Sequence, residues 1–428
     1  MKIVVLGGGL SGIVCARELA KKGHIVTLIE KYSRLGGLAS SFEKEGKLIP
    51  HTYHHFLPNE HLMLDYVKEL GFEKELIWKK SAICFWFDKK RYKLNAPLDI
   101  LFFKPFDFIS KIRLGILGVI TTLRSNWKSL QSVDADSWVR RIVGSKVTDT
   151  LFVPLSKVKF GSLSSVSAAW FGERLHEATS NDEKYAYLKT GLQPFIDSMG
   201  DVILENKGKI ILNATVDKIE SGKVRLTLNK KRKVLNADLV VSSLPPPVLS
   251  EISNLPSESK FLLESINYKP LISFIIGSKN NLSPNYWNVF IKPNYFFGGM
   301  FHHTILNPKG GIGGENLYYF FKYLDDSSLL KKQDEGLKKL FIKDIKSIWP
   351  KFDSNWTKLI KVPHSSPIYT MNYKNLPIKL TNWLYLTGVY RMYPNTRTMN
   401  SAARSGLITA DKILSEISNK GNKDDLSK

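Results

Sequence analysis

The spacing of apolar residues near the N-terminus predicts a strand, a helix and a second strand in immediate succession. Residues 3–6 form a short β-branched run, which is typical of a strand buried on both faces. Residues 11–22 place apolar side chains at helical spacing, and Gly23 follows as a suitable helix end. Residues 24–29 are a second apolar run that closes at the acidic Glu30. The start of the chain therefore predicts a complete βαβ unit.

The pattern then alternates between helical and strand-like stretches. Helical spacing is predicted in five further segments: residues 61–70, 97–130 with an interruption near Pro105, 134–200 with breaks at Pro154, Gly161 and Gly191, 327–348 and 402–417. Strands are predicted in six segments: residues 209–212, 215–219, 223–228, 237–244, 383–386 and, as longer strands, within 260–325. The basic residues 229–233 are interpreted as a solvated hairpin tip.

The turn after the first predicted strand has the spacing G-x-G-x-x-G. Gly7 permits a tight turn, Gly9 lets the backbone approach a pyrophosphate, and Gly12 lets the helix pack closely on the sheet. Leu10 and Ser11 begin the helix, where free N–H groups and the helix dipole favour a phosphate. A lone motif of this kind is weak, but here both strands, the helix and the acidic residue agree. We therefore predict a dinucleotide site.

A second glycine pair follows the acidic residue almost at once. Glu30 stands near the place of a carboxylate that accepts hydrogen bonds from the adenosine ribose. Arg34 could offer charge-assisted bonds to a phosphate, and Gly36 and Gly37 suit another close backbone approach. The alternative is a flexible loop. The residues expected to contact the ligand here are Glu30, Lys31, Arg34, Gly36, Gly37 and Leu38.

Together, these residues resemble the flavin-containing amine oxidoreductase superfamily, which includes monoamine oxidase, protoporphyrinogen oxidase, phytoene desaturase and UDP-galactopyranose mutase. The resemblance implies FAD as the cofactor. Residues 214–219 look like the strand that contributes a backbone contact to adenine, with Val216 in the matching place. Residues 237–245 resemble the strand that returns towards the FAD.

A C-terminal block is similar to the closing motif of the same superfamily. It contains residues 384–388, a Tyr-Pro pair at 393–394, and residues 399–406. The resemblance implies contacts from Gly388, and from a helix beginning under the flavin with Met399, Asn400 and Ala403. Backbone N–H groups there would stabilise negative charge on the reduced ring. Val389 departs from the pattern, because many members carry an acidic residue at that position.

These features predict an α/β protein with a Rossmann-type FAD-binding domain and a discontinuous substrate domain of mixed sheet and helices (α+β). The 428 residues exceed one ordinary hydrophobic core. We expect the FAD-binding domain to contain residues 1–90, 200–255 and 360–418. The substrate domain would contain residues 91–199 and 256–359, and residues 419–428 would form a frayed tail.

Several side chains are candidates for the reacting end of the site. His51, Tyr53, His54 and His55 follow the second glycine pair, and the resemblance brings this loop near the flavin. His54 or His55 could move a proton, because imidazole titrates near neutral pH; packing or a hydrogen bond to FAD is the alternative. Further pocket candidates are His302, His303, Tyr369, Tyr373, Tyr390 and Tyr393. No metal site is predicted.

The net charge of the chain indicates which kinds of partner it favours. The formal net charge is +23 and the pI is about 9.6, which favours anionic partners. No nucleic-acid-binding signature accompanies this charge, so nucleic acid is not expected. Two cysteines suit a reducing compartment. With no apolar run approaching about 20 residues and no signal peptide, we expect a cytoplasmic protein; a peripheral location at the inner face of the membrane is left open.

Residues 100–123 combine apolar, aromatic and basic side chains. Five large apolar residues lie beside Lys104, Lys111 and Arg113, which suits insertion at an anionic membrane surface. A buried helix pair that roofs the substrate pocket is the alternative.

The preferred function is an FAD-dependent oxidoreductase that oxidises a C–N or C–C bond of an apolar small-molecule substrate, such as an isoprenoid or another lipid. One alternative is a flavin-dependent mutase acting on a nucleotide-sugar, for which Arg391, Arg397 and Arg404 are suggestive. The other is a non-catalytic FAD-binding protein. The substrate, the electron acceptor and the oligomeric state stay open.

Overall fold

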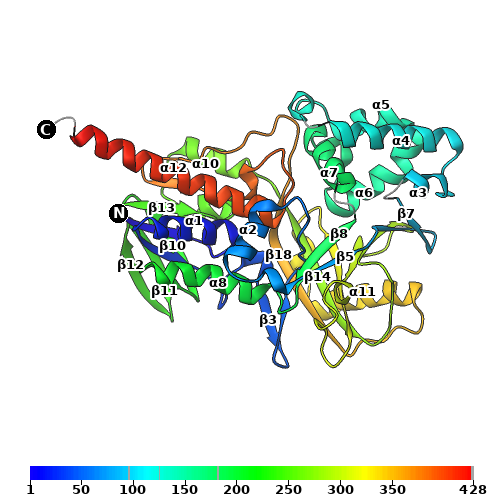
Figure 1. Ribbon diagram of the computed structural model, residues 1–428, viewed down its shortest axis with the longest axis horizontal. Helices are drawn as coiled ribbons and strands as arrows, with labels where there is room; N and C mark the ends of the chain where they lie inside the picture. Colours follow the sequence, from blue (N-terminus) through cyan, green and yellow to red (C-terminus); the bar gives the residue numbers. More distant parts are fainter. Residues whose placement is uncertain (95–96, 125, 181–182, 426–428) are drawn as a thin grey trace.

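A five-stranded parallel sheet forms the centre of the part of the molecule that carries both chain ends (Figure 1). The computed structural model describes residues 1–94, 97–124, 126–180 and 183–425. The strands lie in the order β19 (Leu384–Leu386), β13 (Leu239–Ser242), β1 (Lys2–Leu6), β2 (Ile25–Ile29) and β9 (Lys209–Ile211). Because β1 has a partner on each side, its β-branched residues are buried on both faces, as the sequence predicts.

Alternate residues of β1 point into two different layers. One layer is formed by α1 (Leu10–Lys21), α8 (Leu192–Glu205) and α12 (Met399–Asp425). The other is the antiparallel sheet of β10 (Ala214–Glu220), β11 (Lys223–Leu228) and β12 (Lys231–Asn236). Ile3 and Val5 pack towards the helices, whereas Val4 and Leu6 pack towards the small sheet. The five-stranded parallel sheet is therefore the middle layer of a three-layer arrangement.

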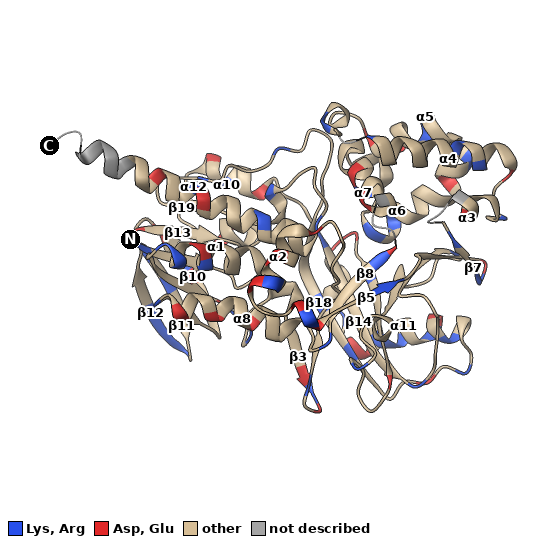
Figure 2. Cartoon of the chain, in the orientation of Figure 1, with Lys and Arg blue, Asp and Glu red and all other residues tan. Residues whose placement is uncertain are grey.

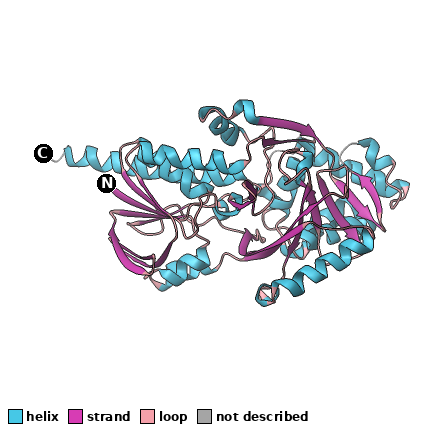
Figure 3. Cartoon of the chain, turned by 90° about the horizontal axis from the view of Figure 1, so that it is seen from below, coloured by secondary structure: helices cyan, strands magenta, loops and turns pink. Residues whose placement is uncertain are grey.

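A seven-stranded sheet lies at the opposite end from the chain termini (Figure 3). Its order is β18 (Trp356–Pro367), β14 (Tyr268–Ser278), β17 (Asn316–Tyr323), β16 (Gly299–His302), β15 (Trp287–Lys292), β6 (Cys84–Phe87) and β7 (Lys90–Lys93). Neighbouring strands are antiparallel except β15 and β6. Leu337, Phe341 and Ile345 of α11 (Asp334–Ile348) pack against it. The boundaries expected at residues 90 and 360 fall inside β7 and β18.

Five helices gather at one corner of the molecule (Figure 1). They are α3 (Pro97–Leu101), α4 (Phe108–Leu123), α5 (Ala135–Val147), α6 (Val153–Lys159) and α7 (Ala168–Ser180). The predicted interruption near Pro105 is confirmed. The predicted break at Pro154 is wrong, because this residue lies in the first turn of α6, where a missing N–H costs nothing. The break occurs instead at Gly144, whose φ of 78° lies outside the helical region.

Other expectations need local correction. Residues 184–188, expected within a helical stretch, form β8 (Lys184–Leu188), which pairs with β5 (Leu76–Lys80). The hairpin tip is shorter than predicted: Asn229 and Lys230 take positive φ values, and β12 already begins at the next residue. The helix α12 continues to Asp425, through most of the segment expected to be a frayed tail. Residues 426–428 lie outside the described part.

The remaining regular elements are β3 (Ser41–Lys44), β4 (Lys47–Pro50), α2 (His61–Glu69), α9 (Pro246–Ile252) and α10 (Ser257–Glu264). Within the described ranges, no helix combines the length and the apolar composition needed to cross a membrane.

Candidate functional site

One large cavity joins the glycine-rich turns to the aromatic side chains of the seven-stranded sheet. Its volume is about 1470 Å³. The β1–α1 turn and the end of β2 line it at one end. At the other end the lining includes Trp287, Phe301 and Tyr323 of the large sheet, with Lys159 and Arg174 of the helical corner. A long ligand and a second molecule can therefore share one enclosure.

The first glycine turn is shaped for close backbone contact. A Cβ at Gly12 would lie 2.1 Å from the carbonyl oxygen of Gly7, so only glycine lets α1 pack against the turn. A Cβ at Gly9 would meet no atom within 4 Å, because this residue faces the cavity. Gly9 is also the N-cap of α1 and brings no capping side chain. The first N–H groups of the helix are thus left for an anion.

Glu30 holds the two glycine turns in place. Its carboxylate accepts hydrogen bonds from the N–H of Gly8 at 2.6 Å and of Tyr32 at 2.9 Å. The second turn packs on the first, because the N–H of Gly36 donates to the carbonyl oxygen of Gly8 at 2.7 Å. A Cβ at Gly37 would lie 3.1 Å from the Cα of Gly9. Both predicted glycine pairs therefore meet at one wall.

Most of the predicted ligand contacts lie on this cavity. The lining includes Gly7, Gly9, Leu10, Ser11, Glu30, Lys31, Arg34, Gly36, Gly37, Leu38, Val216, Gly388 and Met399, together with His54 and His55. Three predicted contacts are not among the lining residues: Gly12, Asn400 and Ala403. Gly12 serves packing, Ala403 is fully buried in the core, and the Asn400 side chain accepts a hydrogen bond from the N–H of Met63 at 3.1 Å.

The chemistry of the glycine-lined end suits FAD. Open space in front of Gly9 accommodates a pyrophosphate, and the Glu30 carboxylate retains lone pairs for ribose hydroxyls. The start of β10 lies beside Glu30, since the N–H of Ala214 donates to the Glu30 carbonyl at 3.0 Å. Val216 of that strand lines the cavity. The residues present therefore fit the pyrophosphate, ribose and adenine parts of the cofactor.

Comparison with known proteins decides the family. The model of the flavin containing amine oxidoreductase family matches residues 10–414. The chain belongs to this family. Like other flavin containing amine oxidoreductases, it is an FAD-dependent oxidoreductase that binds a small-molecule substrate.

The relatives are distant in sequence but similar in fold. The 15-cis-phytoene desaturase of Synechococcus elongatus is 21% identical, over 97% of this chain and 96% of its own. That of Glycine max is 24% identical, but the match spans 58% of this chain and 48% of the relative. A reduced UDP-galactopyranose mutase has a TM-score of 0.78 at 14% identity, covering 97% and 95% of the two chains. Putrescine oxidase bound to putrescine has a TM-score of 0.70 at 15% identity, covering 97% and 99%.

The histidines of this flavin containing amine oxidoreductase are poor proton acceptors. His55 contacts the Tyr286 hydroxyl through Nδ1 at 3.1 Å, and His54 contacts the Thr52 carbonyl oxygen at 3.2 Å. Burial lowers the pKa of His54 to about 4. Burial, followed by repulsion from Arg174, lowers the pKa of His55 to about 3. Both side chains are therefore neutral at neutral pH, far from the pKa that suits proton transfer.

Glu60 is a stronger candidate for proton exchange, and sequence reasoning missed it. The residue is 3% exposed, lines the cavity and accepts the N–H of Leu57 at 3.1 Å. Burial raises its pKa to about 7, although hydrogen bonds from Thr398 and Leu57 oppose the shift. Glu60 is the N-cap residue of α2, but its side chain makes no capping hydrogen bond, and no local sequence signal distinguishes it from a surface carboxylate.

Several other candidates lie away from the cavity. His302 and His303 are both 2% exposed and are absent from its lining, so the expectation that they face the pocket is not supported. His302 is held by the Ser283 carbonyl at 2.6 Å and by Asn316 at 3.0 Å. Tyr390 lines the cavity, whereas Tyr369, Tyr373 and Tyr393 form hydrogen bonds with Val389, Tyr390 and Ser167.

The candidate arginines also divide into those that line the cavity and those that lie away from it. Arg397 lines the cavity, Arg391 donates to the Leu376 carbonyl at 2.9 Å, and Arg404 is exposed on α12. Arg34 lines the cavity and pairs with Glu43 at 3.6 Å. Only two of these four arginines therefore face the space where a ligand would lie.

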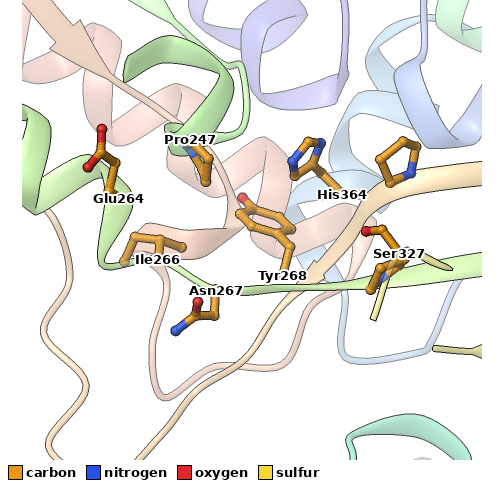
Figure 4. Close-up of a pocket in the computed structure, with 9 residues that line it drawn as sticks. Pro247, Glu264, Ile266, Asn267, Tyr268, Ser327 and His364 are labelled. Carbon is orange, nitrogen blue, oxygen red and sulfur yellow. The ribbon is translucent and has the colours of Figure 1, made fainter. Parts of the chain in front are cut away.

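A smaller cavity of about 310 Å³ adjoins the large one (Figure 4). Tyr268, Pro363 and His364 line both spaces. Figure 4 shows the labelled residues Glu264, Ile266 and Asn267 around the same hollow. This position gives the large cavity a side pocket near β14 and β18.

Proposed function

We propose that this oxidoreductase binds FAD along the glycine-lined end of the large cavity and oxidises a C–N or C–C bond of an apolar substrate at the aromatic end. The continuity of the cavity from Gly9 to Trp287 carries the proposal. When bound, FAD supplies the acceptor for a hydride or two electrons. The protein supplies position, a dry environment and proton exchange.

The proposed FAD contacts come from five segments that are far apart in the sequence. They are Gly7, Gly9, Leu10, Ser11, Glu30, Lys31, Arg34, Gly36, Gly37, Leu38, Val216, Gly388 and Met399, with Asn400 acting through its backbone. The N–H of Gly388 donates to Ser405 Oγ at 2.8 Å, which fixes the turn before α12. Gly12 and Ala403 support the site through packing.

Aromatic side chains support an apolar substrate. Tyr53 stacks on Phe301 with ring centroids 3.8 Å apart, and Trp287 lies 5.1 Å from the same ring. Such a wall favours apolar groups and excludes water from the reacting bond. Glu60, rather than His54 or His55, is proposed to exchange the proton released by substrate oxidation, because its pKa of about 7 matches neutral conditions.

An absorption spectrum of the purified protein, recorded before and after heat release of the ligand, tests the cofactor site. We expect about one FAD per chain and bleaching of the oxidised flavin bands by a true substrate. A protein that stays colourless and takes up no added FAD would overturn the site. Turnover of a UDP-sugar without net bleaching would favour the mutase alternative.

We also propose that the outer face of α3 and α4 contacts an anionic membrane. Ile109, Ile112, Ile116, Val119 and Leu123 recur at helical spacing and are 48–78% exposed. Phe102 and Phe108 beside them are 76% and 71% exposed. The opposite face of α4 is buried, so this helix is apolar on both sides. None of the described residues 97–124 lines the cavity, which disfavours a roof over the pocket.

Cations accompany this apolar face. Lys104 and Arg113 are exposed, and Lys111 is half-buried beside them. Figure 2 shows Lys and Arg positions, coloured blue on the backbone, along the helices of this corner around α4 and α5. Apolar side chains with flanking cations suit the boundary of an anionic bilayer, where each cation contributes about 1 kcal/mol.

Co-sedimentation with phosphatidylcholine vesicles, with and without phosphatidylglycerol, tests this surface. The triple variant Phe102→Ser, Phe108→Ser, Leu123→Ser should bind anionic vesicles at least about tenfold more weakly, because three inserted side chains are lost. The matched control is Phe261→Ser with Leu262→Ser on α10, where both residues are also exposed. Equal binding by both variants would overturn the proposal.

A further inference from the structure

Three cationic side chains converge at the aromatic end of the cavity. Lys159 is the last residue of α6, Arg174 lies in the middle of α7, and Arg397 lies just before α12. All three line the cavity and are largely buried by their neighbours; the Arg174 side chain, for example, is 24% exposed. Because they come from three separate elements, the fold, and not a local motif, brings their charges together.

Aromatic rings position these cations. Lys159 Nζ lies 3.9 Å from the centre of the Trp287 ring, and the Arg174 guanidinium lies 5.6 Å from the same ring. The Arg397 guanidinium lies 4.7 Å from the Trp170 ring and 5.4 Å from the Phe160 ring. A ring face attracts a cation but does not neutralise its charge. The rings therefore orient the cations but do not compensate their charge.

Carboxylates compensate this charge only in part. Arg174 pairs with Glu177, which also accepts a hydrogen bond from the Thr396 hydroxyl at 2.6 Å. Within the described part of the chain, neither Lys159 nor Arg397 forms a salt bridge with a carboxylate. Arg397 donates to the Pro367 carbonyl oxygen at 2.7 Å, which satisfies a donor but leaves the charge. The local excess is positive.

This excess of positive charge affects the pKa values of the cationic side chains. Burial lowers the pKa of Lys159 well below its usual range, and repulsion from Arg174 and then Arg397 adds to the effect. Glu177 acts in the opposite direction but does not prevent the shift. Burial also lowers the pKa of Arg397. Placing like charges in a dry cavity is costly unless an opposite charge joins them.

We propose that Lys159, Arg174 and Arg397 form a subsite for an anionic group, a carboxylate or a phosphate, on an otherwise apolar substrate. The anion would lie among the three cations, and the apolar body would lie along Trp287, Phe301 and Tyr323. This inference deepens the proposed function, since it assigns the substrate to amphiphilic molecules with an acidic head. It rests on the cavity being the substrate site.

Binding of octyl compounds to the holoenzyme tests the subsite. Octanoate, octyl phosphate, octanol and octylamine share one apolar body and differ only in the head. After flavin content is measured, titration calorimetry should give dissociation constants for the two anions at least about tenfold below that of octanol. Binding of either anion should also be accompanied by proton uptake by the protein, because a nearby anion raises the pKa of Lys159. Calorimetry in buffers of different ionisation enthalpy measures this uptake.

Substitutions assign the effect to these residues. Lys159→Met should weaken octanoate binding at least about tenfold, change octanol binding less than about twofold, and abolish the proton uptake. His55 and Glu177 also lie close enough to Lys159 to interact with its charge, and both are retained in this variant. Lys159→Met breaks no ion pair and so carries little risk of misfolding. Lys361→Met, at a lining lysine paired with Asp334 at 2.7 Å, is the matched control and should change neither ligand.

Three results would overturn the subsite. The first is binding of the anions no tighter than that of octanol to flavin-loaded protein, in which case the FAD assignment still stands. The second is a Lys159→Met variant that retains both the anion preference and the proton uptake. The third is an anion preference that occurs only in protein stripped of FAD and vanishes when FAD is added, which would assign the three cations to the cofactor itself. Absence of flavin from the protein would instead contradict the proposed function.

Discussion

The two ends of the cavity are lined by different chemical groups. At the glycine-lined end, backbone groups and one carboxylate form the wall, and Gly12, Gly36 and Gly37 are set by a close approach of main chain to main chain. At the aromatic end, rings and three cations from distant elements form the wall. The first end is suited to one fixed ligand, whereas the second can change its ligand by exchanging side chains. Substitutions should therefore affect the two ends separately.

The largest effect is expected at the aromatic end. Trp287→Ala removes a side chain that is 7% exposed and carries Lys159 and Arg174 on its ring. We expect a loss of about 3–5 kcal/mol in the free energy of unfolding, with FAD stoichiometry unchanged under native conditions. Urea denaturation measures the loss. Trp78→Ala, at 40% exposure, is the control and should cost less than about 1 kcal/mol.

The next effect depends on pH. The folded pKa of Glu60 is about 7 and lies above its unfolded value, so its stabilising contribution is full below pH 4.5 and is lost as the pH rises through 7. The wild type minus Glu60→Gln difference in unfolding free energy should fall by about 2–3 kcal/mol between pH 4.5 and 8. Subtracting the variant cancels the histidines, whose lowered pKa values act in the opposite direction. A flat difference would contradict the shift.

A smaller effect is expected at the glycine-lined end. Gly12→Ala introduces a Cβ that would lie 2.1 Å from the Gly7 carbonyl oxygen, and we expect a loss of about 2 kcal/mol together with weaker FAD binding. Flavin content after dialysis measures the second effect. Gly336→Ala in α11, where a Cβ meets nothing within 4 Å, should be neutral or stabilising by up to about 1 kcal/mol. If both variants behave alike, close packing at Gly12 is not required.

The smallest effect is expected at Ser243. Its hydroxyl contacts the carbonyl oxygens of Leu6 and Gly7, both at 2.9 Å, and so fastens the turn to β13. Ser243→Ala should cost about 1 kcal/mol and loosen FAD slightly. Ser265→Ala, an exposed hydroxyl that bonds to the Leu262 carbonyl, is the control. A larger change in the control than in Ser243→Ala would remove the distinction between the two ends.

The difference between the ends also explains what the sequence could predict. Gly7, Gly9 and Gly12 are required by the geometry of one turn and the helix that follows it. Such a local requirement appears in the sequence as a fixed spacing of glycines. The βαβ unit, the second glycine pair and α12 were predicted for this reason. Lys159, Arg174 and Glu60 leave no such pattern, because only the folded chain brings them to one cavity.

Errors in the predicted elements have a similar origin. The strand β8 lies in a stretch that looks helical, and it is a strand because β5, more than 100 residues earlier, offers a pairing edge. His302 and His303 were expected to face a pocket, but hydrogen bonds to Ser283 and Asn316 hold His302 in the core, and His303 packs there against the rings of Tyr187 and Tyr319. Tertiary contacts outweighed local preference in both cases.

The strand order of the parallel sheet has a consequence for synthesis of the protein. β1 leaves the ribosome first, but its neighbour β13 begins at residue 239 and the edge strand β19 at residue 384. At typical translation rates, the interval between β1 and β19 is roughly 20–80 s. Until β13 emerges, the apolar β1 has only β2 beside it, and β13 in turn lacks its partner β19 for the rest of this interval. A nascent chain of this protein should therefore depend on chaperones until its last 50 residues emerge, and C-terminal truncations should aggregate rather than fold.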